Sequence, residues 1–168
     1  MMEAVEHHTV DDDAKAQYLT FRLGEEEYAI NILSVREIKS WGPVTPLPQS
    51  PPYMLGVINL RGAIVPVVDL RRRFGLPDLE VCPTTTVVIV SAEGETSNGK
   101  VVGLVVDHVS EVYHLADDQI QHSADISSEI DSTFIHGLAK TDERLVILLN
   151  LDRVVSSSIG SEPVVSHD

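Results

Sequence analysis

The sequence predicts an all-β fold that contains two copies of one small barrel unit. Val and Ile dominate the apolar residues, which make up 43% of the chain, whereas aromatic residues make up only 5%. β-Branched residues favour strands. Short stretches of alternating apolar and polar residues are separated by turn signals, a pattern typical of small barrels. The 168 residues suit one domain or two small intertwined halves.

Two strands and a short helix are predicted at the start of the folded body. Apolar and polar residues alternate over 19–23, which indicates a half-buried strand, and again over 28–32 after a turn at 24–27. The stretch Ser-Val-Arg-Glu at 34–37 fits a capping box, in which Glu37 reaches back to the start of a helix. Apolar residues spaced by three could share one face of that helix: Val35, Ile38 and Trp41.

A hairpin is predicted next. Prolines make residues 43–52 extended, an edge strand at most. Residues 56–70, GVINLRGAIVPVVDL, then hold two apolar runs around a turn at 59–62. Asp69 can cap a short helix that runs over 71–74.

Further strands and two tails complete the predicted plan. Strand-rich stretches follow at 84–91, 101–113 and 145–151, and Asn98-Gly99 is a hairpin signal. Both ends of the chain are polar and lack periodicity. The predicted parts are an acidic disordered tail over 1–16, a folded domain over 17–155 and a polar C-terminal tail over 156–168.

The folded body repeats itself. YAINILSVREI at 28–38 matches VVGLVVDHVSEV at 101–112 at one constant offset, so that Glu37 falls on Glu111. The hairpin at 56–70 matches residues 137–151 at a second constant offset, in the same order along the chain. The two hairpins differ in their centres, which read Asn-Leu-Arg-Gly in the first copy and Lys-Thr-Asp-Glu in the second. The shared turn does not require Arg61, which is therefore a candidate for function.

Charge and cysteine content exclude several classes of function. The formal net charge of −14 argues against nucleic acid and anionic membrane surfaces as partners. The single cysteine, Cys82, rules out an internal disulfide framework. The apolar runs are too short to span a bilayer and the N-terminus lacks a signal-peptide pattern, so we expect a cytoplasmic protein without membrane insertion.

No pattern for catalysis, a metal or a cofactor emerges. The sequence contains no GxSxG, GxxxxGK[ST] or GxGxxG motif, although a scattered pair of acidic residues remains an open alternative. The basic run Arg71–Arg73 is interpreted as a solvated helix face, with a binding patch as the alternative. The histidines of the body, which show no metal-ligand spacing, are His108, His114, His122 and His136.

Three linked motifs resemble the CheW family of coupling adaptors in bacterial chemotaxis. They are YAINILSVREI (28–38), VTPLPQSPPYMLGVINLRGAIVPVVDLRRRFG (44–75) and KVVGLVVDHVSEV (100–112). The resemblance covers about 17–155. It implies two small five-stranded β-barrels, SH3-like or OB-like, that pack around a shared core with short helices.

The resemblance also implies a non-catalytic adaptor without a cofactor. Such a protein would couple the cytoplasmic tips of chemoreceptors to the regulatory domain of a CheA-type histidine kinase, at membrane-associated arrays. The alternatives are a coupling protein of another chemosensory pathway, such as surface motility, or a β-barrel that binds a small molecule.

Two sets of partner-facing residues follow from the resemblance. The receptor-facing set is Val35, Glu37, Ile38 and Arg61. The kinase-facing set is Gly56, Val57, Asn59, Val87 and Val88. Structural roles remain open for the receptor-facing set: the core for Val35 and Ile38, the helix cap for Glu37 and a local salt bridge for Arg61.

Overall fold

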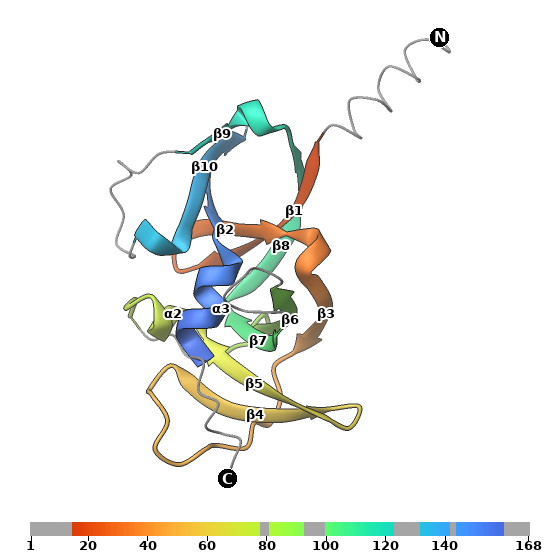
Figure 1. Ribbon diagram of the computed structural model, residues 1–168, viewed down its shortest axis with the longest axis vertical. Helices are drawn as coiled ribbons and strands as arrows, with labels where there is room; N and C mark the ends of the chain where they lie inside the picture. The colour runs from red at the N-terminus through yellow and green to blue at the C-terminus, as the bar shows by residue number, and fades with distance from the viewer. Residues whose placement is uncertain (1–14, 78–80, 93–99, 123–131, 142–143, 160–168) are drawn as a thin grey trace.

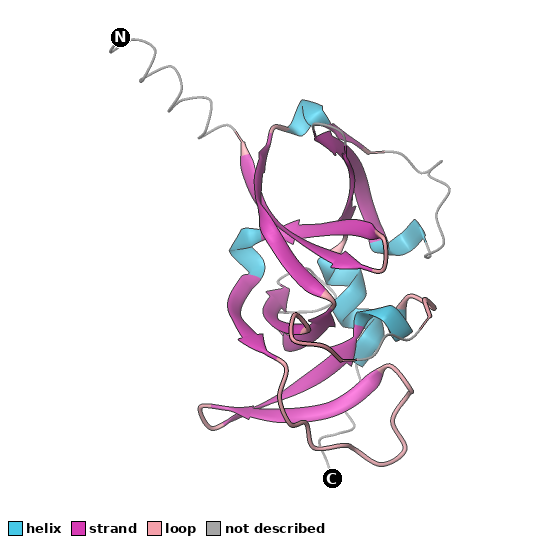
Figure 2. Ribbon diagram, turned by 180° about the vertical axis from the view of Figure 1, so that it is seen from behind, coloured by secondary structure: helices cyan, strands magenta, loops and turns pink. Residues whose placement is uncertain are grey.

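The computed structural model describes residues 15–77, 81–92, 100–122, 132–141 and 144–159, and it is mostly β (Figures 1 and 2). Short helices connect the strands: η1 (Ile32–Ser34), α2 (Leu70–Arg73), η2 (Asp117–Gln119), η3 (Ser132–Phe134) and α3 (Leu151–Ile159). The strands are β1 (Ala16–Leu23), β2 (Glu26–Asn31), β3 (Val35–Ser40), β4 (Met54–Leu60), β5 (Ala63–Asp69), β6 (Thr86–Ala92), β7 (Lys100–Val106), β8 (His108–Leu115), β9 (Ile120–Gln121), β10 (Ile135–Thr141) and β11 (Arg144–Leu149).

The strands form two sheets that curl into two barrels, which confirms the predicted fold class. Barrel A has the strand order β8-β1-β2-β11-β10-β9, and barrel B has the order β3-β6-β7-β5-β4. Barrel A forms the upper half of Figure 1 and barrel B the lower half, with α2 and α3 beside their junction.

Each barrel draws strands from both copies of the sequence repeat. The strands of the first copy are β1 to β5, and their equivalents in the second are β6, β7, β8, β10 and β11. Barrel A combines β1 and β2 of the first copy with β8, β10 and β11 of the second. Barrel B combines β3, β4 and β5 of the first copy with β6 and β7 of the second. Neither copy therefore forms a barrel by itself.

Both barrels close in the same way. After β3 the chain crosses to β4, where Thr45 and Val57 exchange two backbone hydrogen bonds of 2.9 Å. After β8 the chain crosses to β10, which pairs with β9. The proline segment is extended up to residue 47 and makes one bridge, as predicted, but it turns at residues 48–49, where Gln49 has a φ of 59°.

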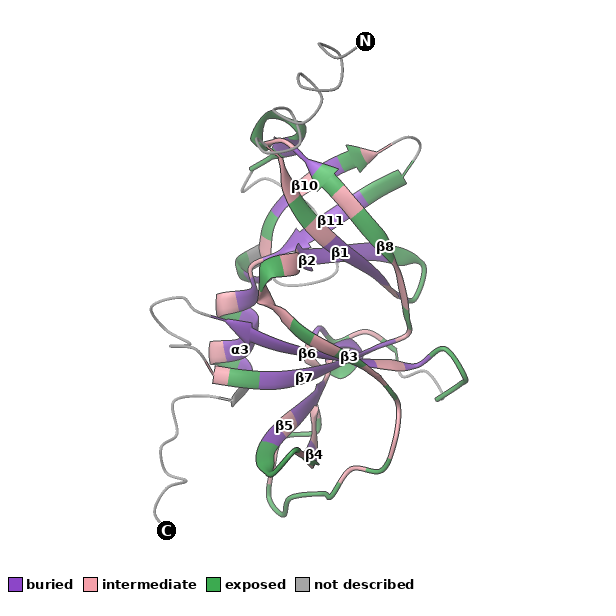
Figure 3. Cartoon of the chain, turned by 90° about the vertical axis from the view of Figure 1, so that its right-hand side faces the viewer, coloured by how far each residue is buried: buried purple, intermediate pink, exposed green. Residues whose placement is uncertain are grey.

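The apolar side chains form three clusters, as a two-barrel fold with a shared core requires. One fills barrel A around Leu148, one fills barrel B around Ile89, and the largest lies between the barrels around Phe21 and Leu104. Successive residues of a strand point to opposite faces. Inner strands therefore have both faces buried, as Figure 3 shows for β1, β6 and β7.

The predicted helix after residue 34 is wrong. Residues 35–40 form strand β3, antiparallel to β6, and a bulge at Arg36 lets Val35 and Glu37 pair with neighbouring residues of β6. The side chain of Asn31, rather than that of Ser34, caps the preceding short helix, with its Oδ1 accepting from the Leu33 amide at 2.9 Å. Pairing with a distant strand thus overrides the local capping signal.

The predicted C-terminal boundary is also too early. Helix α3 runs to Ile159, and Val154, Val155 and Ser158 are buried in it. At the other end β1 begins at Ala16, one residue before the predicted domain start. Residues 1–14 and 160–168 of the predicted tails, the hairpin signal at Asn98-Gly99 and residues 142–143 at the centre of the second hairpin lie outside the described residues.

The basic run is a solvated helix face, as predicted, only at Arg72; Arg71 and Arg73 are bound within the fold. Asp69 caps α2 as expected, accepting from the Arg71 amide at 3.0 Å. Arg73 stacks on the rings of Tyr53 and Phe134, each 4.8 Å from its guanidinium carbon. Its nitrogens also donate to the hydroxyls of Ser157 and Ser158 at 2.8 and 3.0 Å, and so fasten α3 to α2.

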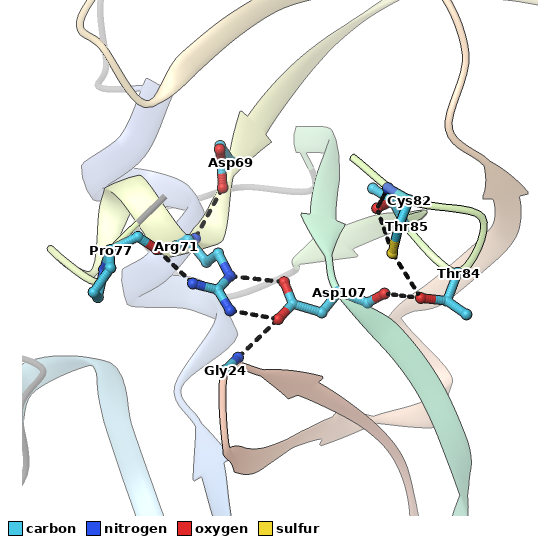
Figure 4. Close-up of polar contacts among 8 residues, drawn as sticks. All are labelled: Gly24, Asp69, Arg71, Pro77, Cys82, Thr84, Thr85 and Asp107. Carbon is cyan, nitrogen blue, oxygen red and sulfur yellow. Dashed lines mark hydrogen bonds and ion pairs between the residues drawn. The ribbon is translucent and has the colours of Figure 1, made fainter. Parts of the chain in front are cut away.

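Arg71 lies at the centre of a polar clamp between the barrels (Figure 4). Its Nε and Nη2 donate to the two carboxylate oxygens of Asp107 at 2.8 and 2.7 Å, and its Nη1 donates to the Pro77 carbonyl. Asp107 also accepts from the Gly24 amide, in the β1–β2 turn of barrel A, at 2.8 Å. The clamp therefore joins the turn of one barrel to the helix that follows β5 of the other.

Candidate partner-binding site

The site is built on the turn between β4 and β5, as the hairpin pattern predicted. Arg61 and Gly62 are its two central residues, with φ angles of 51° and 90°. Positive φ at both positions is the requirement of a type I′ turn, whose twist suits a hairpin. Asn59 stabilises the turn because its Oδ1 accepts from the Gly62 amide at 2.8 Å. Left-handed backbone costs a non-glycine residue roughly 1–2 kcal/mol, so Arg61 is an unfavourable choice for folding alone.

Strand β3 brings Glu37 to this turn. Arg61 donates to Glu37 Oε1 through both Nη1 and Nη2, at 2.9 and 2.8 Å. The Arg61 side chain is 70% exposed and that of Glu37 is 28% exposed. An exposed ion pair of this kind contributes about 0–1 kcal/mol to stability. The structure thus contains the local salt bridge that we kept as the alternative role for Arg61, and the capping role of Glu37 is wrong because no helix begins there.

Apolar side chains accompany the ion pair. Ile38, next to Glu37 in β3, is 46% exposed, which argues against a core role. Val35 is half-buried and packs against the shared core, so the core role that was open for Val35 applies in part. Ile64, which is not among the predicted residues, pairs with Asn59 just beyond the turn and is 64% exposed. The sequence there, Ala-Ile-Val-Pro-Val-Val, is apolar throughout and carries no signal that Ile64 faces outward.

The predicted kinase-facing set divides into surface and interior residues. Val57 is half-buried and Asn59 is exposed, both on β4. Gly56 is buried, and a Cβ atom there would lie 2.1 Å from the Thr45 carbonyl oxygen. Val87 and Val88 are 4% and 0% exposed, inside barrel B and the shared core respectively. Their side chains therefore cannot provide the direct contact surface that we predicted for them.

The polar groups of the described residues form no arrangement that suggests catalysis. A cavity of about 220 Å³ lies beside the clamp, and its two most buried charges, Arg71 and Asp107, already bind each other. Among the described residues, no cluster of three His, Cys, Asp or Glu side chains has the geometry of a metal site. None of the helices in the described ranges is long and apolar enough to cross a membrane.

Comparison with known proteins identifies the family. A model of the CheW-like domain matches residues 17–158, which include both barrels and most of α3. The chain belongs to the CheW-like family. The match extends past residue 155, in agreement with the folded helix there.

Named CheW proteins align over most of this CheW-like chain. The "Probable chemotaxis protein CheW" of Rhizobium etli is 42% identical over 84% of this chain and 88% of its own length. The chemotaxis protein CheW of Klebsiella aerogenes is 39% identical over 84% of this chain and 82% of its own.

A solved CheW structure has the same fold. The scaffolding protein TtCheW from Thermoanaerobacter tengcongensis superposes with a TM-score of 0.76 and 33% identity, and the match covers 83% of this chain and 92% of that one. Family membership makes the chain a chemotaxis scaffold of a non-catalytic class.

Proposed function

We propose that this CheW-family protein couples the cytoplasmic tips of chemoreceptors to a CheA-type histidine kinase at membrane-associated arrays. The observation that carries the proposal is the Arg61–Glu37 pair, which an arginine at a left-handed turn position holds at the surface of barrel B. Two opposite charges at the surface, with the exposed apolar side chain of Ile38 on the same strand as Glu37, suit the side of a receptor helix, which offers apolar and charged residues at helical spacing.

The exposed ion pair can exchange partners at little cost. The pair contributes little to stability. A receptor carboxylate can therefore bind Arg61 in place of Glu37, or a receptor cation can bind Glu37 in place of Arg61. The second hairpin has no arginine at the equivalent position, and its sequence there is Asp142. We infer that the receptor contacts barrel B through Val35, Glu37, Ile38 and Arg61.

For the kinase, the proposal rests on β4. Val57 and Asn59 have side chains that reach the surface, whereas Gly56 supports them by letting the crossing segment approach. Kinase binding through β4 and receptor binding through the turn would place both partners on one hairpin. That arrangement supports a role in which the occupancy of one contact influences the other.

A coupling role in another chemosensory pathway is the second candidate. The Protein FrzA of Myxococcus xanthus is 31% identical over 93 residues, which cover 55% of this chain and 55% of that protein. The test is affinity capture from the native cell, followed by identification of the captured kinase and receptor. Capture of a histidine kinase that serves a pathway other than chemotaxis would favour this second candidate.

A reconstituted kinase assay with a receptor tip fragment tests the site. Arg61→Glu places two carboxylates together and should reduce receptor coupling at least about tenfold, because like charges in contact oppose binding. Lys140→Glu is the matched control, a charge reversal on the exposed part of β10 in the other hairpin. The site assignment fails if Arg61→Glu couples normally, or if both reversals reduce coupling equally at unchanged stability.

A further inference from the structure

The charges of this protein are divided unevenly between the described fold and the rest of the chain. The described residues contain all 12 Lys and Arg residues but only 10 of the 26 Asp and Glu residues. The described fold therefore carries a formal charge of +2, although the whole chain carries −14. The other 16 acidic residues lie in sequence outside the described residues, where there is no Lys or Arg. The net negative charge thus belongs to segments attached to a mildly basic fold.

Positive charge exceeds negative charge around Glu37 in barrel B. Glu37 and Lys39 lie on the same face of β3, because the pairing with β6 is regular from residue 37 onward and side chains alternate along a strand. Arg61 reaches this face through its two hydrogen bonds to Glu37 Oε1. Lys39 has no ion-pair partner among the described residues, and Arg36 is exposed in the same strand. We call Lys39 and Arg61 the basic edge.

The start of β1 lies close to the basic edge. Tyr18 of β1 pairs with Asn31, the last residue of β2, and η1 then leads from Asn31 directly into β3. Only six residues separate Asn31 from Glu37, which is at most about 20 Å of extended chain. Figure 1 shows the start of β1, in red, and β3 on the same side of the molecule. The sequence that precedes β1 therefore joins the fold near Lys39 and Arg61.

That preceding sequence is strongly acidic. Residues 3–13, which we call the acidic segment, lie outside the described residues and contain five carboxylates and no Lys or Arg: Glu3, Glu6, Asp11, Asp12 and Asp13. Measured from the first residue of β1, Asp11 can reach up to about 17 Å and Glu3 up to about 45 Å. These lengths span the separation from the basic edge. A group tethered so closely has an effective concentration on the order of millimolar.

We propose that the acidic segment binds the basic edge of its own chain and competes there with the receptor. Its carboxylates accept hydrogen bonds from Lys39 and from Arg61, whose side chain is 70% exposed and which already binds a carboxylate in this way. The competition rests on the proposed function, in which the receptor uses Arg61, whereas the contact within the chain does not. The acidic segment then acts as a tethered inhibitor that the receptor must displace.

The test uses the full chain labelled with ¹⁵N and a nitroxide on the cysteine introduced by Thr9→Cys, with Cys82→Ser to remove the native thiol. We expect the nitroxide to broaden the amide signals of residues 37–39 and 61–62 at low salt. The broadening should disappear at about 0.5 M salt, where the Debye length is only about 4 Å. Absence of broadening there would overturn the proposal. So would equal broadening when nitroxide and ¹⁵N are carried by different molecules, which would indicate a second copy.

Variants of the labelled chain test whether charge causes the contact. Replacing the five acidic residues of the segment by their amides should abolish the broadening, and Lys39→Gln should reduce it about twofold, because each removes part of the attraction. Lys140→Gln, on the exposed part of β10 in barrel A, is the matched control for Lys39→Gln and should leave the broadening unchanged. Broadening that persists without the five carboxylates, or that falls equally in both lysine variants, would contradict the proposal.

The competition is measured with a receptor tip fragment. The chain with the five amides should bind this fragment about two- to fivefold more tightly than the unmodified chain, because no molecules are held in the occupied state. Unchanged affinity in that variant would overturn the competition. Failure of the proposed function has a different signature: Arg61→Glu would then couple normally in the kinase assay, while the nitroxide would still report the contact in the chain that retains Arg61.

Discussion

Gly56 and Gly137 hold equivalent positions in the two barrels, each beneath the segment that closes its barrel. Both follow a bulge in their hairpin, between Met54 and Gly56 in β4 and between Ile135 and Gly137 in β10. A Cβ atom at Gly56 would lie 2.1 Å from the Thr45 carbonyl oxygen, and one at Gly137 would lie 2.7 Å from Cγ2 of Ile120. The repeat thus preserves a glycine because the crossing chain leaves no room for a side chain.

The two glycines should differ in their tolerance to alanine. Gly56→Ala meets rigid backbone, and its φ of 147° is also unfavourable for other residues, so we expect a loss of several kcal/mol. Gly137→Ala meets the Cγ2 methyl of Ile120 at 2.7 Å rather than backbone at 2.1 Å, and Gly137 has no left-handed φ, so this variant should lose less. Urea unfolding measures both. Gly42→Ala, which has nothing within 4 Å, is the control, and equal losses at all three glycines would contradict the argument.

The clamp between the barrels should be important for stability. Arg71→Met leaves the Asp107 carboxylate without its guanidinium in a site where the two side chains are 10% and 16% exposed. Removing one partner of a buried pair costs about 3–5 kcal/mol. Arg72→Met, at a side chain that is 41% exposed, is the matched control and should cost less than about 1 kcal/mol. Similar unfolding midpoints for the two variants would show that the clamp is not a stabilising contact.

Val88 offers a test of the corrected kinase-facing set. Because its side chain is completely buried in the shared core, Val88→Ala should destabilise the fold by about 2 kcal/mol. The affinity of the Val88→Ala variant for the kinase, measured well below its unfolding temperature, should remain unchanged. Asn59→Ala, at an exposed side chain of β4, should instead lower kinase affinity, although it also removes the hydrogen bond to the Gly62 amide at a cost of about 1 kcal/mol. The reverse pattern would restore Val88 as a contact residue.

His136 should make stability depend on pH. Partial desolvation, and to a smaller extent the nearby His122, lower the pKa of His136 below its usual value of 6.5, against an opposing influence of Asp117. The unfolded chain therefore binds the proton more tightly. Stability is full above about pH 6.5 and falls as the pH drops toward the lowered pKa of the folded state.

The measurement is the urea midpoint at several pH values between about 7.5 and 5.5. His136→Gln cannot titrate and should have a flatter profile than the unmodified protein. His108→Gln, at an exposed histidine of β8, is the control and should keep the original profile. A profile unaffected by His136→Gln would assign the pH dependence to other groups.

Local pattern predicted the strands well and their environment less well. The alternation over 19–23 and the hairpin at 56–70 reflect short-range rules and reappear as β1 and as β4 with β5. The run TVVIVSA of β6 is apolar on both faces, which was the available sign that Val87 and Val88 are interior residues.

The failures share a physical origin in long-range contacts. Strand β3 exists because β6, some fifty residues later, supplies its hydrogen bonds. Helix α3 is held by Arg73, which no local pattern near 156–159 reveals. The Arg61–Glu37 contact likewise joins two elements whose approach only the barrel geometry determines.

The exchange of strands between the two copies has a consequence for synthesis and folding. As the chain emerges from the ribosome, β1 and β2 lack the flanking strands β8 and β11 until nearly the whole protein has been made. Folding must therefore wait for contacts between distant parts of the chain, which are slow to form. The apolar face of this first hairpin meanwhile remains exposed to aggregation or to a chaperone. A chain cut between the two copies yields two incomplete pieces, each with the strands that the other needs.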